Sequence, residues 1–443
     1  MSLLVNGLSG LLAAQHALNV SSQNTANVNT PGYSRQEALL ASRQGNSFGR
    51  LDAGSGVSVV SLRRVADSYL TAGVWRTTSQ AGFDGQYKQL IGYVEQVFGS
   101  DQLGITAGLD SFYAALNAAA DAPQSTAPRQ QILASAQALA NRFNQLSANL
   151  DLQTRQIDEQ SDALLAESNT RLAEVAKLNR SIVETLSKGG NVAALEDQRD
   201  QAVEALSKLM QLQVNRQRDG SLSLSMANGQ ALVLGGSAAA LSRTGNAFNV
   251  SIANQTLPLA GNPGGSLGAL MAYRSDELVP LRGQLNDLAQ DIADNINTQL
   301  AAGLDIQDPA QAGAPLFSYD PLNPAGSIRL DAGITYDKLA FASAGGGLGD
   351  NRNLLALLEQ KDAFYSDYVG IVGSLAVRSG QVSAEAKASA QLQEDAMAQR
   401  DSVSGVNLDE EGMQLMRYMQ AYQANAKVVG AADQLFDTLL SMF

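Results

Sequence analysis

Few side chains in this 443-residue sequence could carry out chemistry, because it has no cysteine and a single histidine, His16. The lack of cysteine excludes disulfides, thiolate nucleophiles and cysteine-ligated metals. One histidine cannot supply a multi-histidine zinc site or a cysteine–histidine pair. We therefore interpret His16 as a solvated or capping position on a helix.

Carboxylates remain, and one group of them is Asp409, Glu410 and Glu411. Neighbouring carboxylates could act in acid–base catalysis or hold a metal ion. At the start of a helix, however, acidic side chains more often stabilise its positive end. We keep an enzyme as an alternative hypothesis, but expect no catalytic residue, cofactor or metal site.

The charge of the chain argues against nucleic acid as a partner. There are 30 basic and 43 acidic residues, a net charge of -13, and no basic cluster, whereas binding to phosphates needs a basic surface. No apolar run approaches the roughly 18 residues of a membrane span. The first basic side chain is Arg35, so we also expect no secretory signal.

The N-terminal segment predicts an amphipathic helix that ends near Asn27 or Asn29. Pro31 and Gly32 suit the second and third positions of a type II turn, because the third position requires positive φ. Leucines at helical spacing form one apolar stripe on this helix: Leu4, Leu8, Leu11 and Leu18.

The C-terminal segment predicts a regular helix after a break near residues 402–407. A strict seven-residue repeat favours a supercoiling helix that packs on a partner. We expect the two terminal helices to pair and to leave faces for other subunits. The repeated positions are Leu408, Leu415, Tyr422, Val429 and Phe436.

The middle of the chain alternates between β and helical patterns. Residues 33–64 predict a hairpin-like segment, and Asn228-Gly229 between alternating apolar residues is a strong hairpin signal. Residues 128–186 predict one very long helix or a coiled-coil hairpin. Shorter helices are expected over 193–210, over about 270–303 and from 353 onward.

These patterns predict a mainly α fold with a β middle, in three regions. The terminal helices form a coiled-coil assembly module over 1–45 and 401–443. A helical domain with a hairpin-like start covers 46–212 and 352–400, and helix 270–303 packs on it. A β-rich outer domain covers 213–269 and 304–351.

Both ends of the chain resemble a known family. "SSQNTANVNTPGYSRQ", residues 21–36, resembles the N-terminal signature of the rod, hook and hook-associated proteins of the bacterial flagellum, and residues 406–440 resemble their C-terminal signature. The residues after the corner and before the last helix are most similar to those of a hook-associated member. The signature corner consists of Asn27, Asn29, Pro31, Gly32 and Tyr33.

The resemblance implies a structural adaptor at the junction between hook and filament, outside the cell, assembled by terminal-helix packing after type III export. The implied partners are hook protein, a second junction protein, further copies of this chain in a ring, and an export chaperone that holds the C-terminal helix. The two apolar stripes would then form the assembly interface. A rod or hook component and a coiled-coil adhesin are the alternatives.

Overall fold

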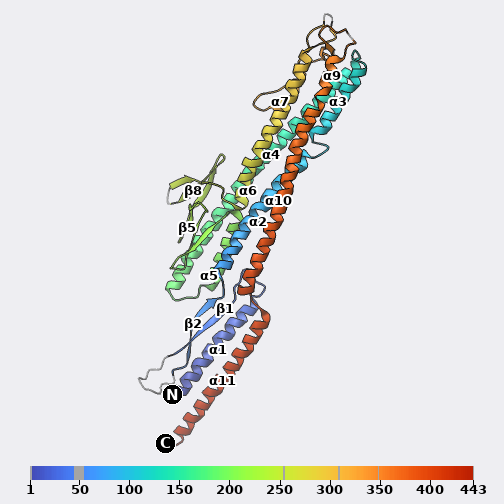
Figure 1. Ribbon diagram of the computed structural model, residues 1–443. Coiled ribbons are helices and arrows are strands. Elements are labelled where there is room, and N and C mark those ends of the chain that lie inside the picture. Colours follow the sequence, from blue (N-terminus) through green and yellow to red (C-terminus); the bar gives the residue numbers. More distant parts are fainter. Residues whose placement is uncertain (1, 44–53, 253–254, 308–309, 348, 443) are drawn as a thin grey trace. The chain divides into compact units, whose positions relative to one another are not determined.

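The computed structural model describes residues 2–43, 54–252, 255–307, 310–347 and 349–442. The chain forms two compact units. The first consists of Met1–Gly82, Leu165–Gly265 and Ser389–Phe443, and the second of Phe83–Leu164 and Ser266–Ala388. The fold is mainly helical with a β-rich insertion (Figure 1), so the predicted fold class is confirmed.

The first unit contains the paired terminal helices, which lie side by side in Figure 1 with both chain ends at the same end of the pair. The first helix ends at Ala26, one residue before the predicted limit. A two-stranded antiparallel ribbon follows it, as predicted for residues 33–64. These elements are α1 (Ser2–Ala26), β1 (Gln36–Ser42), β2 (Val57–Arg64) and α11 (Leu408–Leu440).

The corner after α1 has the predicted turn geometry. The backbone N–H of Tyr33 donates to the carbonyl of Thr30 at 3.2 Å, which closes a four-residue turn with Pro31 and Gly32 in the middle. Gly32 has φ of +72°, and a type II turn requires positive φ at this third position. The sequence prediction is confirmed here because the turn is encoded by adjacent residues.

The β-rich part of the first unit packs on α4 (Thr126–Ser187) through asparagine side chains. Asn179 exchanges two hydrogen bonds with the backbone of Leu222, at 2.8 and 3.0 Å, and Asn169 does the same with Leu241, at 2.8 and 2.7 Å. Each amide thus satisfies both backbone polar groups of one strand residue, as a neighbouring strand would. The strands form two sheets, β3 (Gln213–Arg216), β4 (Leu222–Ser225), β5 (Ala231–Leu234) and β6 (Ser237–Ala238), and β7 (Ala240–Thr244), β8 (Ala247–Ile252) and β9 (Gln255–Pro258).

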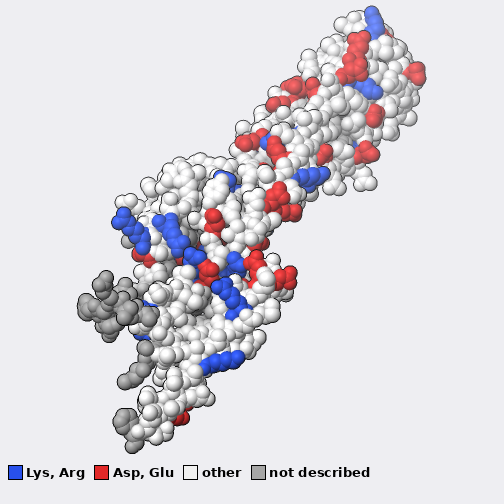
Figure 2. Space-filling model, turned by 60° about the horizontal axis from the view of Figure 1, so that its bottom comes forward, with Lys and Arg blue, Asp and Glu red and all other residues white. Residues whose placement is uncertain are grey.

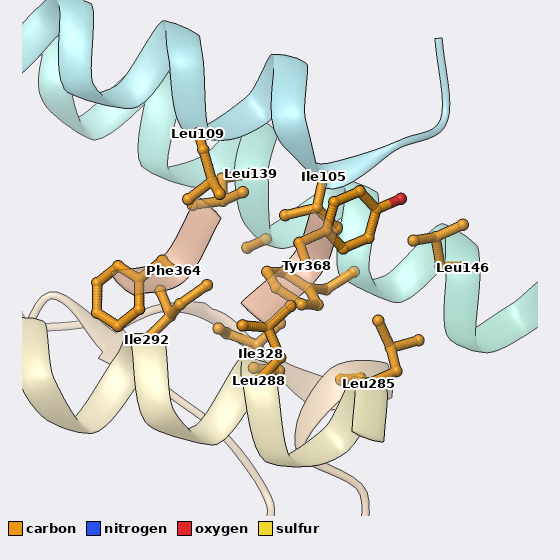
Figure 3. Close-up of a cluster of buried hydrophobic side chains, with 14 of the residues drawn as sticks. Ile105, Leu109, Leu139, Leu146, Leu285, Leu288, Ile292, Ile328, Phe364 and Tyr368 are labelled. Carbon is orange, nitrogen blue, oxygen red and sulfur yellow. The ribbon is translucent and has the colours of Figure 1, made fainter. Parts of the chain in front are cut away.

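The second unit is a helical body around an apolar core. Side chains from four helices and from Ile328 point toward one another in Figure 3, and the labelled ones are buried. A π-helical turn, Arg274–Leu278, joins α6 to α7 without a break. Besides α4, the helices that contribute are α2 (Ser68–Phe98), α3 (Ile105–Asp121), α6 (Gly265–Tyr273), α7 (Val279–Ala301), α9 (Arg352–Glu359) and α10 (Lys361–Ser404).

This division differs from the predicted domains. The segment 304–351 lies in the helical unit, whereas 213–265 belongs to the other unit. The reason is packing: Phe317 and Phe341 are buried in the same core as the helices, and Asn297 of α7 accepts hydrogen bonds from the backbone of Leu316 and Phe317. Short elements complete the segment: β10 (Gly303–Leu304), β11 (Phe317–Ser318), α8 (Pro324–Ser327), β12 (Arg329–Leu330), a 3-10 turn (Tyr336–Lys338) and β13 (Ala342–Ser343).

The remaining helical predictions agree with the structure. Residues 126–187 form one helix of 62 residues and not a coiled-coil hairpin. Gly189 follows it at φ of +73°, a conformation that ends helices and favours glycine. Next comes α5 (Ala193–Leu209), close to the predicted 193–210. The long helices α2, α4 and α10 each have residues in both units. The unit boundaries therefore fall inside helices that the sequence analysis predicted as continuous.

Candidate assembly interface

The two terminal helices run antiparallel at close range. Gly7 of α1 lies against Val429 of α11, and Gly10 lies against Asn425. A β-carbon at position 7 would come within 2.9 Å of Cγ2 of Val429, closer than side-chain atoms normally approach. The two glycines therefore set how closely the helices pack.

The face that α1 buries is not the predicted leucine stripe. It consists of small side chains at steps of three and four residues, among them Ala14, Ala17 and Ser21. Leu11 and Leu18 are half-buried beside this face, whereas Leu4 and Leu8 are 43% and 48% exposed. Small residues allow the closest approach of two helices, and their regular spacing along α1 was the signal for this contact. The role of the leucine stripe in assembly stays a prediction.

The positions of the predicted repeat on α11 differ in their exposure. The three middle positions, Leu415, Tyr422 and Val429, are half-buried, and Val429 contacts α1 directly at Gly7. The outer positions, Leu408 and Phe436, are 54% and 60% exposed. The structure thus joins the centre of the repeat to α1 and leaves its ends on the surface.

The outward surface of the helix pair has two apolar rows. The leucine row, Leu4, Leu8 and Leu12 of α1, is 43%, 48% and 47% exposed. The methionine row, Met413, Met416 and Met419 of α11, is 62%, 58% and 50% exposed. Residues 1–34 contain no acidic or basic side chain other than His16, which is exposed.

Charge is correspondingly sparse at this end of the molecule. In Figure 2 few charged side chains lie at the lower end of the view, where the terminal helices are. Exposed apolar surface that charges do not interrupt commonly marks a protein–protein contact. The leucine row meets this description, whereas in the methionine row the exposed Arg417 lies next to Met416.

The signature corner is held by Asn24, a residue that the sequence analysis did not single out. Its amide exchanges two hydrogen bonds with the backbone of Gln36, at 2.9 and 3.0 Å, and its oxygen accepts the hydroxyl of Tyr33 at 2.8 Å. Burial raises the pKa of Tyr33 to about 12, and the carboxylates of Asp197 and Glu411 contribute. Asn24 thus connects α1, the corner and β1.

The predicted corner residues have different surroundings. Pro31 accepts a hydrogen bond from Nε2 of Gln201 at 2.5 Å through its carbonyl, and Tyr33 is bonded to Asn24. Asn27 and Asn29 lie in the preceding turn, which the backbone N–H of Thr30 closes on the carbonyl of Asn27 at 2.9 Å. The side chain of Asn27 donates to the carbonyl of Gln23 at 2.8 Å.

The three carboxylates at the start of α11 do not form one site. Glu411 is 4% exposed and accepts hydrogen bonds from Ser21 and from Nδ2 of Asn24. Glu410 pairs with Arg35 at 2.5 Å, and Asp409 is exposed. Across the described ranges, no cluster of three or more acidic or histidine side chains is arranged to hold a metal ion.

The N-terminus of α11 is capped in the usual way. The side-chain oxygen of Asn407 accepts the backbone N–H groups of Asp409 and Glu410. These donors have no partner inside the helix, so the cap stabilises its first turn. Asp409 and Glu410 also place negative charge at the positive end of the helix.

The corner and the ribbon are bound to α5 by charged groups. The guanidinium of Arg64, at the end of β2, donates to Asp197 at 2.9 Å and to Asp200 at 2.6 Å, and it is only 11% exposed. Burial opposes the charge on Arg64, but the carboxylates of Asp200, Asp197 and Glu196 outweigh it and raise the pKa of Arg64. The signal for this contact in the sequence was the set of acidic residues that recur at helical spacing in α5.

A polar cleft of about 750 Å³ lies between the corner, α5 and the break that precedes α11. Trp75, the single tryptophan of the chain, lines this cleft and is 8% exposed. Its fluorescence can therefore report changes in the packing around this cleft.

None of the helices in the described ranges is both long and apolar enough to cross a membrane.

Three family models match this chain. Residues 91–317, just over half of the chain, match the helical domain of flagellar hook-associated protein FlgK. Residues 4–33 match a flagella basal body rod protein model, and residues 397–442 match the C-terminal model of flagellar basal body rod FlgEFG proteins.

Curated relatives cover nearly the whole chain. Flagellar hook-associated protein 1 of Salmonella typhimurium is 27% identical over all of both chains, and that of Bacillus subtilis is 24% identical over 97% of this chain and 96% of its own. A solved structure, the flagellar hook junction protein FlgK from Burkholderia pseudomallei, is 26% identical with a TM-score of 0.52. That match covers 56% of this chain and 47% of the solved chain.

Proposed function

Because the chain belongs to the family of flagellar hook-associated protein FlgK, we propose that it is a structural component of the bacterial flagellum at the junction between hook and filament. In this role the protein converts no substrate, and its chemistry is the burial of surface between subunits. The function requires a surface that remains available after the chain has folded.

The proposal rests on the apolar surface that the terminal helices leave exposed. Both ends of the chain match flagellar rod-protein models, and the helices at these ends leave the leucine and methionine rows on the surface. Exposing large apolar side chains on both helices of a pair is unfavourable in water. Neighbouring subunits would bury these rows and the outer repeat positions Leu408 and Phe436.

The partners follow from the position of a junction. Hook protein would lie on one side, a second junction protein on the other, and further copies of this chain beside it in a ring. We further propose extracellular localisation after type III export without a cleaved Sec signal, and an export chaperone that holds α11 until the chain leaves the cell. The exposed apolar side chains of α11 would need such cover.

A rod or hook component proper is the second candidate, since the terminal models are named for rod proteins. The helical block supports the junction role instead, because residues 91–317 match a domain that is specific to the hook-associated protein by name. None of the family models named above supports the alternative of a coiled-coil adhesin.

The proposal is tested by complementing a strain that lacks the gene. Wild-type protein should restore motility and should be detected by immunogold labelling at the distal end of the hook. Leu8→Asp should fold but fail to restore motility, because a charge in the leucine row cannot be buried in a contact without a partner. Ser22→Asp, at an exposed polar position of α1 beyond the leucine row, is the matched control and should restore it. Labelling along the rod, or none on the flagellum, would refute the junction role.

A further inference from the structure

We propose that the methionine row of α11 is a site of reversible oxidation, at which peroxides convert the thioether side chains of the unassembled subunit to sulfoxides. The three side chains of the row, Met413, Met416 and Met419, are each half or more exposed. The inference rests on the proposed function, because its consequence is that an oxidised subunit attaches poorly to the hook.

Exposure separates these methionines from most others in the chain. Cysteine is absent, so an oxidant meets no thiol and methionine carries all of the sulfur. Met210 follows α5 and Met226 follows β4, and they are only 0% and 2% exposed. Met271 and Met397 are half-buried. Among the methionines that the structure describes, only the row and Met442, just beyond α11, are exposed.

The reaction needs no reactant other than the peroxide. The thioether sulfur attacks one oxygen of hydrogen peroxide, so that a sulfur–oxygen bond forms while the oxygen–oxygen bond breaks. Sulfur gives up two electrons, and the second peroxide oxygen leaves as water together with both protons. The product, methionine sulfoxide, is returned to methionine by the reductases MsrA and MsrB, one for each sulfoxide epimer.

Oxidation should spare the fold and weaken attachment. A sulfoxide is polar, whereas the thioether is apolar. In the free protein the row lies on the surface, so the new oxygen atoms remain in water. In a contact with another subunit they would be buried without donors, which is unfavourable. The leucine row of α1 has no sulfur, so the peroxide changes only the α11 side of the helix pair.

Peptide mass spectrometry of the folded, full-length protein tests the site itself. The protein is treated with hydrogen peroxide at neutral pH, and the mass gain of one oxygen atom is followed for each methionine. Because oxidation follows exposure, the row should react at least about tenfold faster than Met210 and Met226. A row that reacts no faster than these two buried residues would overturn the inference.

Attachment to hooks isolated from a strain that lacks the gene tests the consequence. Oxidised wild-type protein should attach severalfold less than untreated protein, with an unchanged thermal midpoint by circular dichroism. Reduction by MsrA and MsrB together should restore attachment. Undiminished attachment after oxidation, or no recovery after complete reduction, would overturn the inference. The proposed function fails separately, if untreated wild-type protein does not attach.

Leucine substitutions identify the residues responsible. A variant that combines Met413→Leu, Met416→Leu and Met419→Leu keeps similar volume and helix propensity, and it should attach equally with and without peroxide. Met442→Leu, at an exposed methionine outside the row, is the matched control and should stay as sensitive as wild type. A triple variant as sensitive as wild type, or a resistant Met442→Leu, would contradict the assignment. If the triple variant does not attach at all, the reductase recovery of wild type decides.

Discussion

Glu411 shows how a single side chain joins the two ends of the chain. Its carboxylate is buried, and the partners it accepts from, Ser21 and Asn24 of α1, are neutral. A buried carboxylate is costly unless hydrogen bonds replace its lost water. The neighbouring Glu410, in contrast, pairs with Arg35 and is 53% exposed, so adjacent acids serve different purposes.

Replacing Glu411 should therefore cost much more than replacing Glu410. We expect Glu411→Ala to lower the free energy of unfolding by about 1 to 3 kcal/mol, because Ser21 and Asn24 lose their acceptor. Glu410→Ala should cost no more than about 1 kcal/mol, as is usual for an exposed ion pair. Urea unfolding followed by circular dichroism measures both, and equal losses would contradict this role of Glu411.

Tyr33 should report the state of the corner through its titration. The fold raises the pKa of this phenol from 10.0 to about 12, so the neutral form is favoured in the folded protein. The stabilisation is complete below pH 10 and is lost as the pH rises through about 12. The difference between absorbance titrations of wild type and Tyr33→Phe isolates this group. A midpoint near pH 10 would mean that the phenol is free in solution.

Among the secondary-structure elements, β2 and α5 show how the ribbon is fixed to the helical part of its unit. Arg64 contacts Asp197 and Asp200, and the backbone N–H of Ser34 also donates to Asp197 at 3.2 Å. One acidic face of α5 thus receives both the strand end and the corner. This contact is one of several that join the ribbon and the corner to the rest of the unit.

Two adjacent arginines test the contact. Arg64→Ala should lower the free energy of unfolding by about 3 to 5 kcal/mol, because it leaves the buried carboxylate of Asp197 without its cation. Arg63 pairs with Glu37 on the surface and is 60% exposed, so Arg63→Ala should cost no more than about 1 kcal/mol. Thermal unfolding measures the stability, and the emission of Trp75 should shift to longer wavelength in Arg64→Ala alone. Equal effects of the two variants would argue against the contact.

For the molecule as a whole, the largest apolar core and the terminal helices occupy separate parts of the chain. Every buried residue of the core cluster in the described ranges lies between Tyr87 and Val382. The terminal helices contribute mainly small buried residues such as Ala13, Ala14 and Ala17. Folding of the body and the proposed assembly through the ends are therefore assigned to different segments.

A chain that lacks residues 1–45 and 401–443 should retain this core. We expect cooperative thermal unfolding by circular dichroism, since the whole cluster is kept, but no attachment to hooks in cells. The full-length protein under the same conditions is the control. A fragment that unfolds without a cooperative transition would mean that the terminal helices are part of the main core.

Local sequence determined the elements of this protein. The corner at Pro31-Gly32, the hairpin at Asn228-Gly229, the long helix over 126–187 and the break before Leu408 were all predictable, because each depends on the backbone preferences of adjacent residues or on one regular period. The family signatures at the two ends likewise consist of contiguous residues.

Only the tertiary structure decided which surfaces these elements bury. Leu4, Leu8 and Leu12 of α1 stay exposed because glycine and alanine let α11 approach more closely on the other face. Arg64 meets acids more than 130 residues away in the chain. The segment 304–351 joined the helical unit for the same reason, since Phe317 and Phe341 found their core there. Hydrophobicity along a chain shows which residues can be buried, whereas the partner of each one depends on contacts between segments that are distant in sequence.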